Sequence, residues 1–442
     1  DQTRFVPRAE AYIFEALEWL GIAPDETVGK NEKFGPYRQS ERKAMYQQYA
    51  DQLINSGWAY YAFDTAESLD AMRKEAEANG KTFIYNHSVR EQLDNSLTVS
   101  REKVEERIAN GEHYVIRFKT PVNEILELKD IIRGDIKFDT NLLDDKVLFK
   151  SDGMPTYHLA NIVDDHLMGI THVVRGNEYL ASTPKYNLLY DAYGWDRPTY
   201  IHLPPVMKDE HAKLSKRNGD ASYQDLTKQG YLKDAILNYI ALLGWSPADE
   251  EILSLDDLIK QFNIEHISKA PAIFDIDKLK WMNGEYLKAM DSDTFYNMAE
   301  PYIKEVIKKD MDLKKIAALV KTRIEVFPEI REMIDFFEEV PEYDSAMYCH
   351  KKMKTNEETS LAVLKEVLPV LEAQEDYTND PLFASLSAFV KEKGYKNGYV
   401  MWPLRTAVSG KQMTPAGATE IMEIIGKEET LKRVKAAIEK LS

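Results

Sequence analysis

Cysteine is almost absent from this chain. One cysteine, Cys349, in 442 residues excludes an internal disulfide framework and any zinc site made of clustered cysteines. No apolar run approaches the roughly 20 residues of a membrane-spanning helix. The opening DQTRFVPRAE has no apolar core of a secretion signal. We therefore expect a cytoplasmic protein without protein-bound zinc.

Other common signatures are missing as well. The chain has neither of the usual glycine-rich phosphate loops, which disfavours P-loop and dinucleotide-binding folds, and it has no G-x-S-x-G turn. Lysine and arginine number 57 against 74 acidic residues, a net charge of −17. This charge disfavours general, sequence-independent binding of nucleic acid, although an acidic body can still carry a local basic face.

What is present is a globular composition, 44% hydrophobic and 30% charged, and a length that suggests about three domains. Helical spacing of apolar residues predicts helices over 7–20 and 45–54, and YYAF at Tyr60–Phe63 is typical of a strand. A charged helix and short β-rich runs follow up to residue 150, which we interpret as an inserted α+β module. The runs lie at 66–78, 114–121, 130–139 and 146–150.

The pattern returns to α/β after residue 150. THVVRG and IHLPPV are apolar strands of the kind buried on both faces of a parallel sheet, and a helix through Tyr186–Tyr193 lies between them. From residue 222 the chain is almost wholly helical, for example over 316–326 and 361–371, and Gly426 breaks the last helix. The sequence therefore predicts an α/β part followed by an all-helical C-terminal region.

The stretch EHAKLSKRNGD, residues 210–220, has two interpretations. Charge clusters that end in Asn-Gly are usually surface turns. Alternatively, Lys213, Ser215 and Lys216 form a mobile loop that binds phosphate, because lysine is a compact charge on a flexible stem. The loop follows a predicted parallel strand, and ligands of such sheets lie beyond the strand C-termini. This placement favours the phosphate-binding interpretation.

Arg175 ends an apolar strand and precedes Gly176. A guanidinium at such a place needs an anionic partner. Either it forms an ion pair with Asp164 or Asp165, or it forms a bidentate pair with a substrate carboxylate. The neighbouring Asp164-Asp165-His166 run could ligate a metal, but a charge cluster at a helix end is the preferred interpretation.

Four more side chains are candidates for the same pocket. Tyr157 and Asn161 lie one helical turn apart and can line one pocket, with packing as the alternative for both. Glu178 and Tyr179 follow Arg175 and could contact a ribose and an aromatic base. An ordinary helix start is the alternative for this pair.

Long stretches of the chain together resemble bacterial-type glutamyl-tRNA synthetases, which are class I aminoacyl-tRNA synthetases. KLSKR is similar to the second class I signature, the KMSKS motif. The other matching stretches are DQTRF, GPYRQSER, GWAYYAF, KSDGMPTYHLANIVDDHLMGITHVVRGNEYLASTPKY, KAPAIFDIDKLKWMNGEYL and RTAVSGKQMTPAGATEIMEIIGKEETLKRV. The resemblance covers nearly the whole chain. It implies that residues 210–220 form a loop that binds the phosphates of ATP.

The resemblance implies an ATP- and Mg²⁺-dependent glutamate–tRNA ligase that forms glutamyl-adenylate and transfers glutamate to tRNA(Glu). Its implied catalytic residues are Lys213 and Lys216. The implied ATP contacts are Lys213, Ser215, Lys216, Glu178, Tyr179 and Val206, and the implied glutamate contacts are Tyr157, Asn161 and Arg175. Arg38 and Lys269 are plausible contacts to the tRNA backbone, with solvated or structural ion pairs as their alternative. A monomer is the family's usual state.

The implied architecture is a split Rossmann-like catalytic domain with an inserted module. The expected parts are residues 1–63 and 151–208 for the catalytic domain, 64–150 for acceptor binding, 209–290 for the loop and stem contact, and 291–442 for anticodon binding. The family begins with a βα unit that carries the HIGH signature. None of the nine histidines here lies in a His-x-Gly-His context. We therefore expect that unit to be missing, the remaining sheet to have an exposed edge, and the chain as given to be an inactive fragment.

Three rival functions stay open at this point. A glutaminyl-tRNA synthetase is disfavoured by the helical C-terminal region, where such enzymes usually have β-barrels. A non-catalytic tRNA-binding or scaffold protein is favoured by the missing HIGH signature and opposed by KLSKR and Arg175. A small-molecule adenylyltransferase leaves the roughly 230 residues after KLSKR without a role.

Overall fold

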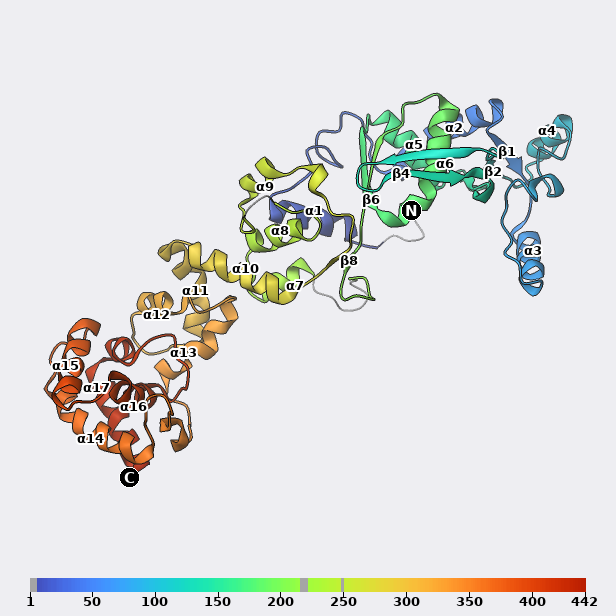
Figure 1. Ribbon diagram of the computed structural model, residues 1–442. Helices are drawn as coiled ribbons and strands as arrows, with labels where there is room; N and C mark the ends of the chain where they lie inside the picture. Colours follow the sequence, from blue (N-terminus) through green and yellow to red (C-terminus); the bar gives the residue numbers. More distant parts are fainter. Residues whose placement is uncertain (1–5, 215–221, 248–249) are drawn as a thin grey trace. The chain divides into compact units, whose positions relative to one another are not determined.

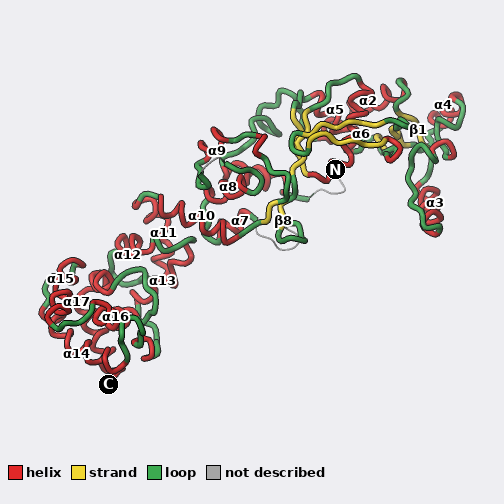
Figure 2. The backbone as a smooth tube through the Cα atoms, viewed as in Figure 1, coloured by secondary structure: helices red, strands yellow, loops and turns green. Residues whose placement is uncertain are grey.

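The computed structural model describes residues 6–214, 222–247 and 250–442, and Ser215 and Lys216 of the expected phosphate loop lie outside these ranges. The chain forms two compact units. The N-terminal unit comprises Asp1–Leu214, Ala241–Asp249 and Leu258–Phe274, and the C-terminal unit comprises Ser215–Ile240, Glu250–Asp257 and Asp275–Ser442. Every strand of the described residues belongs to the N-terminal unit, and the C-terminal unit is built of helices and loops (Figures 1 and 2).

The first part of the N-terminal unit combines helices with a small antiparallel sheet. The sheet has the order β1-β2-β5, and β2 pairs with both neighbours. Tyr46, Leu53 and Ile116 are fully buried in its core. The elements are α1 (Ala9–Leu20), α2 (Lys43–Asn55), β1 (Ala59–Ala62), α3 (Ala66–Ala78), α4 (Arg101–Ala109), β2 (Val115–Phe118) and β5 (Val147–Phe149).

A four-stranded sheet with the order β4-β3-β7-β6 forms the second part of this unit. β3 and β4 are an antiparallel hairpin, whereas β3, β7 and β6 run parallel. The elements are β3 (Ile125–Asp130), β4 (Gly134–Asp139), α5 (Tyr157–Leu167), β6 (His172–Gly176), a 3₁₀ segment η5 (Asn177–Ser182), α6 (Thr183–Tyr193) and β7 (Thr199–Leu203). Each of the two sheets therefore combines strands from the expected insertion, residues 64–150, with strands from outside it.

The expected open sheet edge is present at β6. Among the described residues β6 is hydrogen-bonded to β7 alone, and Val174 in its middle is 56% exposed. A strand buried on both sides would hide such a side chain. The free backbone groups of β6 therefore face outward along one side.

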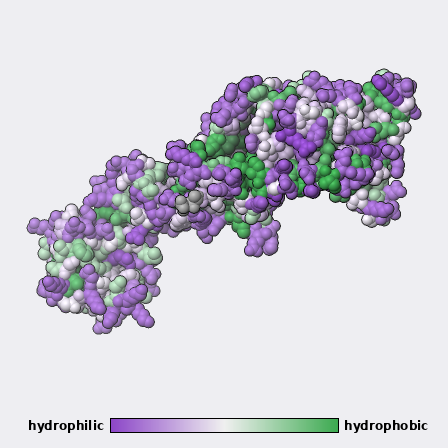
Figure 3. Space-filling view, turned by 45° about the horizontal axis from the view of Figure 1, so that its top comes forward, coloured by the Kyte–Doolittle hydropathy of each residue, from purple (hydrophilic) through white to green (hydrophobic). Residues whose placement is uncertain are grey.

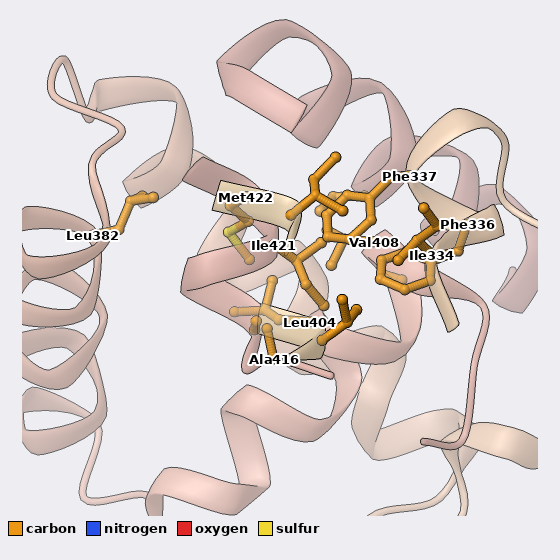
Figure 4. Packing of buried hydrophobic residues seen from close by; sticks show 14 of the residues in the cluster. Ile334, Phe336, Phe337, Leu382, Leu404, Val408, Ala416, Ile421 and Met422 are labelled. Atoms are coloured by element: carbon orange, nitrogen blue, oxygen red, sulfur yellow. The ribbon is translucent and has the colours of Figure 1, made fainter. Parts of the chain in front are cut away.

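The C-terminal unit packs its helices around one large core, in which Phe336, Phe337, Ile421 and Met422 are fully buried (Figure 4). Gly426 adopts φ 77° inside the last helix, a conformation that costs glycine little, and kinks it as the sequence predicts. The helices are α10 (Ile276–Ala289), α11 (Ser292–Val306), α12 (Leu313–Val320), α13 (Ile330–Glu338), α14 (Glu357–Ala373), α15 (Asn379–Glu392), α16 (Asn397–Ser409) and α17 (Ala418–Leu441).

The remaining elements are α7 (Tyr223–Lys228), α8 (Lys233–Leu242), α9 (Leu255–Gln261), β8 (Val206–Met207) and β9 (Ala272–Ile273). No helix within the described ranges is long and apolar enough to cross a membrane. Hydrophilic residues cover most of the surface visible in the space-filling view (Figure 3). The α/β fold with a helical C-terminal region is confirmed.

Three local predictions need correction. IHLPPV is not one strand: β7 ends at Leu203, because Pro204 and Pro205 cannot donate ladder hydrogen bonds, and β8 begins at Val206. The predicted helix over 316–326 ends at Val320. The run 130–139 is not one strand: Asp130 ends β3, residues 131–133 form a turn, and residues 134–139 form β4, while the rest of β3, residues 125–129, is not predicted from the sequence.

Candidate active site

Arg175 and His202 lie opposite each other on the parallel strands β6 and β7. Residues paired in register project from the same face of a sheet. The Arg175 Nε–H donates to His202 Nε2 at 3.2 Å, and Arg175 Nη2 donates to the Thr183 hydroxyl at 2.8 Å. Arg175 also lies 4.9 Å from the ring centroid of Tyr186 and 5.2 Å from that of Tyr179, within the range of cation–π attraction.

The predicted alternative for Arg175, an ion pair with Asp164 or Asp165, is wrong. Asp164 instead pairs with the buried guanidinium of Arg42 at 2.8 Å and accepts the Tyr46 hydroxyl. Asp165 makes no ion pair among the described residues, and burial raises its pKa to about 6, with the charge of Arg175 opposing that rise. Arg175 therefore has no carboxylate partner in the described part of the chain.

His166, the third residue of the possible metal run, stacks on Trp195 with ring centroids 3.8 Å apart. Its neighbour Asp164 is held by Arg42, as described above. Asp164 and His166 are therefore engaged with different partners, as expected of a charge cluster at a helix end.

Helix α5 supplies two more of the predicted side chains. Tyr157 begins the helix, is 50% exposed, and lies with its ring 5.7 Å from that of Tyr179. Asn161 follows one turn later, and its Oδ1 is buried without a hydrogen-bond partner among the described residues. Burial raises the pKa of Tyr186 to about 12, against the lowering effect of the Arg175 charge and of Asn161. Tyr157, Asn161, Arg175 and Tyr179 therefore belong to one cluster.

A glycine makes room for Glu178. A Cβ placed on Gly176 would overlap the Glu178 carboxylate, so only glycine allows this side chain to fold back over the end of β6. η5 then carries Tyr179 toward Tyr157 and Arg175. The chain after β6 thus presents a carboxylate and an aromatic ring beside the guanidinium.

The described end of the KLSKR stretch returns onto β8. Leu214 N–H donates to the Val206 carbonyl at 3.0 Å, and Met207 forms an isolated antiparallel β-bridge with the exposed Lys213. The tip of this hairpin is closed by the Asp209 carboxylate, which accepts two backbone N–H groups at 2.8 Å. Val206 and Lys213 are therefore neighbours beyond the C-terminal end of β7, where ligands of parallel sheets bind.

The two predicted tRNA contacts differ in their surroundings. Arg38 donates to Glu10 at 2.6 Å and to Glu41 at 3.1 Å, and its side chain is 46% exposed. The ion-pair alternative thus describes its state in this structure. Lys269 is exposed, and no described carboxylate lies within ion-pair distance of it.

A cavity of about 1140 Å³ in the N-terminal unit is rich in cationic side chains. Its lining joins the start of α5 at Tyr157 and His158 to residues of the antiparallel sheet and its loops. Burial lowers the pKa of His158 to about 4, and the charges of Lys185 and Lys146 act in the same direction. The cations of the lining are Lys43, Arg73, Arg117, Lys146 and Lys150.

The C-terminal unit has a hollow of about 510 Å³, lined among others by Arg323, Arg405, Thr414 and Pro415. The Arg405 Nε is buried without a hydrogen-bond partner among the described residues, and its Nη2 donates to the Gln412 carbonyl at 2.8 Å. Burial lowers the pKa of Arg405. A donor left unpaired in this way costs about 1–3 kcal/mol.

Sequence reasoning missed two buried residues of the cluster, Asp130 and His202. Both side chains are fully buried, and the carboxylate lies 2.7 Å from the imidazole Nδ1. The signal for His202 was its place inside the apolar strand IHL, because a buried histidine needs a polar partner. Asp130 gave less signal, because it ends β3, which the sequence does not predict as a strand.

Comparison with known proteins agrees with this geometry. Residues 1–281 match the family model "tRNA synthetases class I (E and Q), catalytic domain", and residues 294–438 match "Anticodon binding domain". The glutamate–tRNA ligase of Clostridium botulinum is 53% identical over 442 residues, and that of Clostridium tetani 55%; the matches span all of this chain and 90% and 89% of those proteins.

A solved structure is similar throughout. The crystal structure of a glutamate tRNA ligase from Elizabethkingia meningosepticum in complex with its amino acid is 40% identical, with a TM-score of 0.91 over all of this chain and 91% of that one. These matches support neither the expected inactive fragment nor the glutaminyl and scaffold alternatives. The chain belongs to the glutamate–tRNA ligase family of class I aminoacyl-tRNA synthetases.

Proposed function

We propose that this protein joins L-glutamate to tRNA(Glu) in two steps. The α-carboxylate of glutamate attacks the α-phosphorus of ATP, pyrophosphate leaves, and glutamyl-adenylate forms. The 3′-terminal ribose hydroxyl of tRNA then attacks the glutamyl carbonyl and releases AMP. The observation that carries the proposal is Arg175, a guanidinium at the C-terminal end of the parallel strand β6 with no described carboxylate partner.

The glutamate pocket is assigned to the cluster around Arg175. A guanidinium that can offer two parallel N–H groups binds a carboxylate strongly, and glutamate brings two carboxylates. Asn161 offers a buried amide oxygen without a described partner, which can accept from the substrate ammonium. Tyr157 would complete the wall with its exposed ring and hydroxyl.

ATP is assigned to the residues beyond the ends of β6 and β7. Glu178 would accept from the ribose, Tyr179 and Val206 would contact adenosine, and Lys213 would approach the phosphates. Ser215 and Lys216 are assigned to the phosphates on sequence grounds, since they lie outside the described residues. Charge that develops on the phosphates would be stabilised by lysine, and Mg²⁺ would enter with ATP, because it prefers phosphate and water oxygens.

The tRNA is assigned to both units. Its 3′ end would enter the cationic cavity of the N-terminal unit, because that cavity reaches Tyr157 of the glutamate pocket. We retain the domain division given above, with residues 64–150 for the acceptor end, 209–290 for the stem and 291–442 for the anticodon. Lys269 and Arg38 would contact the sugar–phosphate backbone of the tRNA. Arg38 would then have to give up its ion pairs with Glu10 and Glu41 to bind a phosphate.

The hollow at Arg405 is the proposed place for an unpaired anticodon base. RNA sequence is read mainly from splayed single-stranded bases, through stacking and through hydrogen bonds to their edges. Arg405 lies 4.7 Å from the Trp402 ring centroid and keeps a donor unpaired. A base carbonyl or ring nitrogen would satisfy that donor.

We further propose a cytoplasmic monomer that uses no zinc. The support is the family resemblance and the single cysteine, which leaves no cysteine cluster to bind the metal. Light scattering tests the oligomeric state, and metal analysis of the purified protein tests for zinc.

The test of the proposed activity is aminoacylation of tRNA(Glu) by the protein from its complete gene, with labelled glutamate and ATP. Charging that requires all three substrates supports the proposal. Binding of tRNA without charging would leave the scaffold alternative in its place.

A further inference from the structure

We propose that Asp130 and His202 are positioning residues that hold Arg175 so that its two Nη groups face the substrate carboxylate. The inference rests on the proposed function, in which Arg175 binds glutamate. It adds two residues to the specificity of that reaction, neither of which needs to touch the substrate.

Asp130 is an anchored acceptor. Its Oδ1 accepts the backbone N–H groups of Ile132 at 3.0 Å and Arg133 at 2.9 Å, and its Oδ2 accepts the backbone N–H of His202 at 3.0 Å. Its side chain is fully buried. With three backbone donors fixed around it, this carboxylate cannot turn to serve another partner, so its remaining hydrogen bond, to His202 Nδ1, has a defined direction.

The carboxylate determines the tautomer of His202. An ionised carboxylate can only accept, so Nδ1, at 2.7 Å from it, must carry the proton. In a neutral imidazole the other nitrogen is then an acceptor. Burial lowers the pKa of His202, and this effect outweighs the opposing effect of the hydrogen bond to Asp130. The ring is therefore neutral at neutral pH. Nε2 is therefore the lone pair that receives Arg175 Nε–H.

Thr183 completes the support on the same edge of the guanidinium. Its hydroxyl donates to the Tyr179 carbonyl at 3.0 Å and accepts from Arg175 Nη2 at 2.8 Å, and its oxygen lies 3.1 Å from His202 Nε2. Two of the five N–H groups of Arg175 are thereby used. The three that remain lie on Nη1 and Nη2, the pair of nitrogens that forms a fork for one carboxylate.

The alternative tautomer would deprive Arg175 of its acceptor. If Nε2 carried the proton, it could donate to the Thr183 hydroxyl, 3.1 Å away, but it would have no lone pair for the Arg175 Nε–H, and the guanidinium would turn away from His202. Replacing Asp130 by Asn can produce that state, because the Asn amide can donate to Nδ1 and move the ring proton to Nε2. The loss of an orienting acid beside a histidine is known to disturb catalysis through the wrong tautomer.

The experiment measures KM for glutamate and, separately, for ATP in aminoacylation by the protein from its complete gene. Asp130→Asn and His202→Leu are each expected to raise the glutamate KM at least tenfold and to leave the ATP KM within twofold. His202→Gln, whose amide oxygen can still accept from Arg175, is expected to stay within about threefold. Glutamate KM values within twofold for both Asp130→Asn and His202→Leu would overturn the inference.

A matched control separates positioning from mere stability. Asp145 is another fully buried carboxylate of the N-terminal unit, and it accepts Thr120 N–H at 3.1 Å and the Tyr60 hydroxyl at 2.7 Å. Asp145→Asn should lower the melting temperature without a selective rise in the glutamate KM. A rise equal to that of Asp130→Asn would mean that any buried carboxylate acts alike, and would overturn the inference.

Arg175→Lys distinguishes failure of the inference from failure of the proposed function. If Arg175→Lys raises the glutamate KM and Asp130→Asn does not, the positioning role alone is wrong. If Arg175→Lys has no effect on the glutamate KM, both the proposed carboxylate site and its positioning are wrong.

A measurement on the unsubstituted protein covers variants that do not fold. Proton–nitrogen correlation spectra of protein labelled with ¹⁵N-histidine distinguish protonated from bare ring nitrogens. The His202 peak is assigned as the peak that is absent from the spectrum of the His202→Gln variant, or by selective back-labelling. The inference predicts a protonated Nδ1 and a bare Nε2 on His202. A protonated Nε2 would overturn it.

Discussion

Arg175 on β6 and His202 on β7 are paired in register, and the Nε–H of the first donates to Nε2 of the second over 3.2 Å. This contact arises because the two residues are paired in register and project from the same face of the sheet. It fixes one edge of the guanidinium against the protein and leaves the other edge for an anion. The recognition of glutamate in this account depends on that division.

Arg175→Lys is expected to raise the KM for glutamate about 30- to 150-fold. Lysine keeps the charge but loses the planar fork and cannot reach His202 and a carboxylate together, a loss of about 2–3 kcal/mol for a charged hydrogen-bonded pair. Steady-state aminoacylation with varied glutamate measures this. Arg197→Lys is the control, since Arg197 forms a surface pair with Asp191. Equal effects of the two substitutions would contradict the role of Arg175.

Asp165→Asn is expected to stabilise the protein at pH 8 but not at pH 4. Burial raises the pKa of Asp165 to about 6 from 3.8, so the folded state binds a proton that the unfolded state has lost between these values. Stability from this group is therefore highest below about pH 4 and falls as pH rises to 6. Removing the charge should return roughly 1–3 kcal/mol above pH 6.

Urea unfolding of Asp165→Asn and the unsubstituted protein at several pH values tests this. The expected difference in free energy of unfolding grows between pH 4 and 6 and is then constant. The same substitution at Asp191, which forms a surface pair, should change stability by less than about 0.5 kcal/mol. A difference at Asp165 that does not vary with pH would contradict the raised pKa of this partly buried carboxylate.

Arg42→Ala is expected to destabilise the N-terminal unit by about 3–5 kcal/mol, because it leaves Asp164 partly buried without its partner. The Arg42 side chain is 2% exposed and pairs with Asp164 at 2.8 Å. Lys74→Ala is the control, since its pair with Asp70 is exposed and should matter by less than 1 kcal/mol. Thermal unfolding followed by calorimetry gives both values. Similar small losses in the two variants would show that Arg42 is not a structural anchor.

Arg405→Ala is expected to raise the KM for tRNA at least tenfold and to leave the KM for glutamate and ATP unchanged. The reason is the loss of the unpaired donor of the C-terminal hollow. Arg331→Ala serves as the control, because Arg331 pairs with Glu305 on the surface of the same unit. Competition between tRNA variants changed at single anticodon positions then identifies the base concerned. An unchanged tRNA KM in Arg405→Ala would remove this hollow from the tRNA interface.

Much of the fold follows from local patterns. The helix at Ala66–Ala78 has the predicted bounds, and α17 bends at Gly426, because these features depend on neighbouring residues alone. The β3–β4 hairpin was only half recognised: the pairing of β3 with β7 links residues 70 positions apart, such as Asp130 and Tyr200, and no local signal specifies it. The same long-range pairing brings Asp130 to His202.

The candidate site was predicted unevenly for the same reason. Tyr157, Asn161, Arg175, Glu178 and Tyr179 could be named from their positions at element ends and from the family resemblance. Whether Arg175 was already paired could not be decided from sequence, since the competing partner of Asp164 proved to be Arg42, more than a hundred residues away. Only the fold shows which charges are already compensated.

The most direct test of the account is a comparison of glutamate and glutamine as substrates. The protein from its complete gene, supplied with ATP and total tRNA, should attach labelled glutamate and leave labelled glutamine free. Arg175→Lys should lose most of that activity while its ATP KM stays unchanged. Attachment of glutamine in preference to glutamate, or tRNA binding with neither amino acid attached, would contradict a carboxylate site at Arg175.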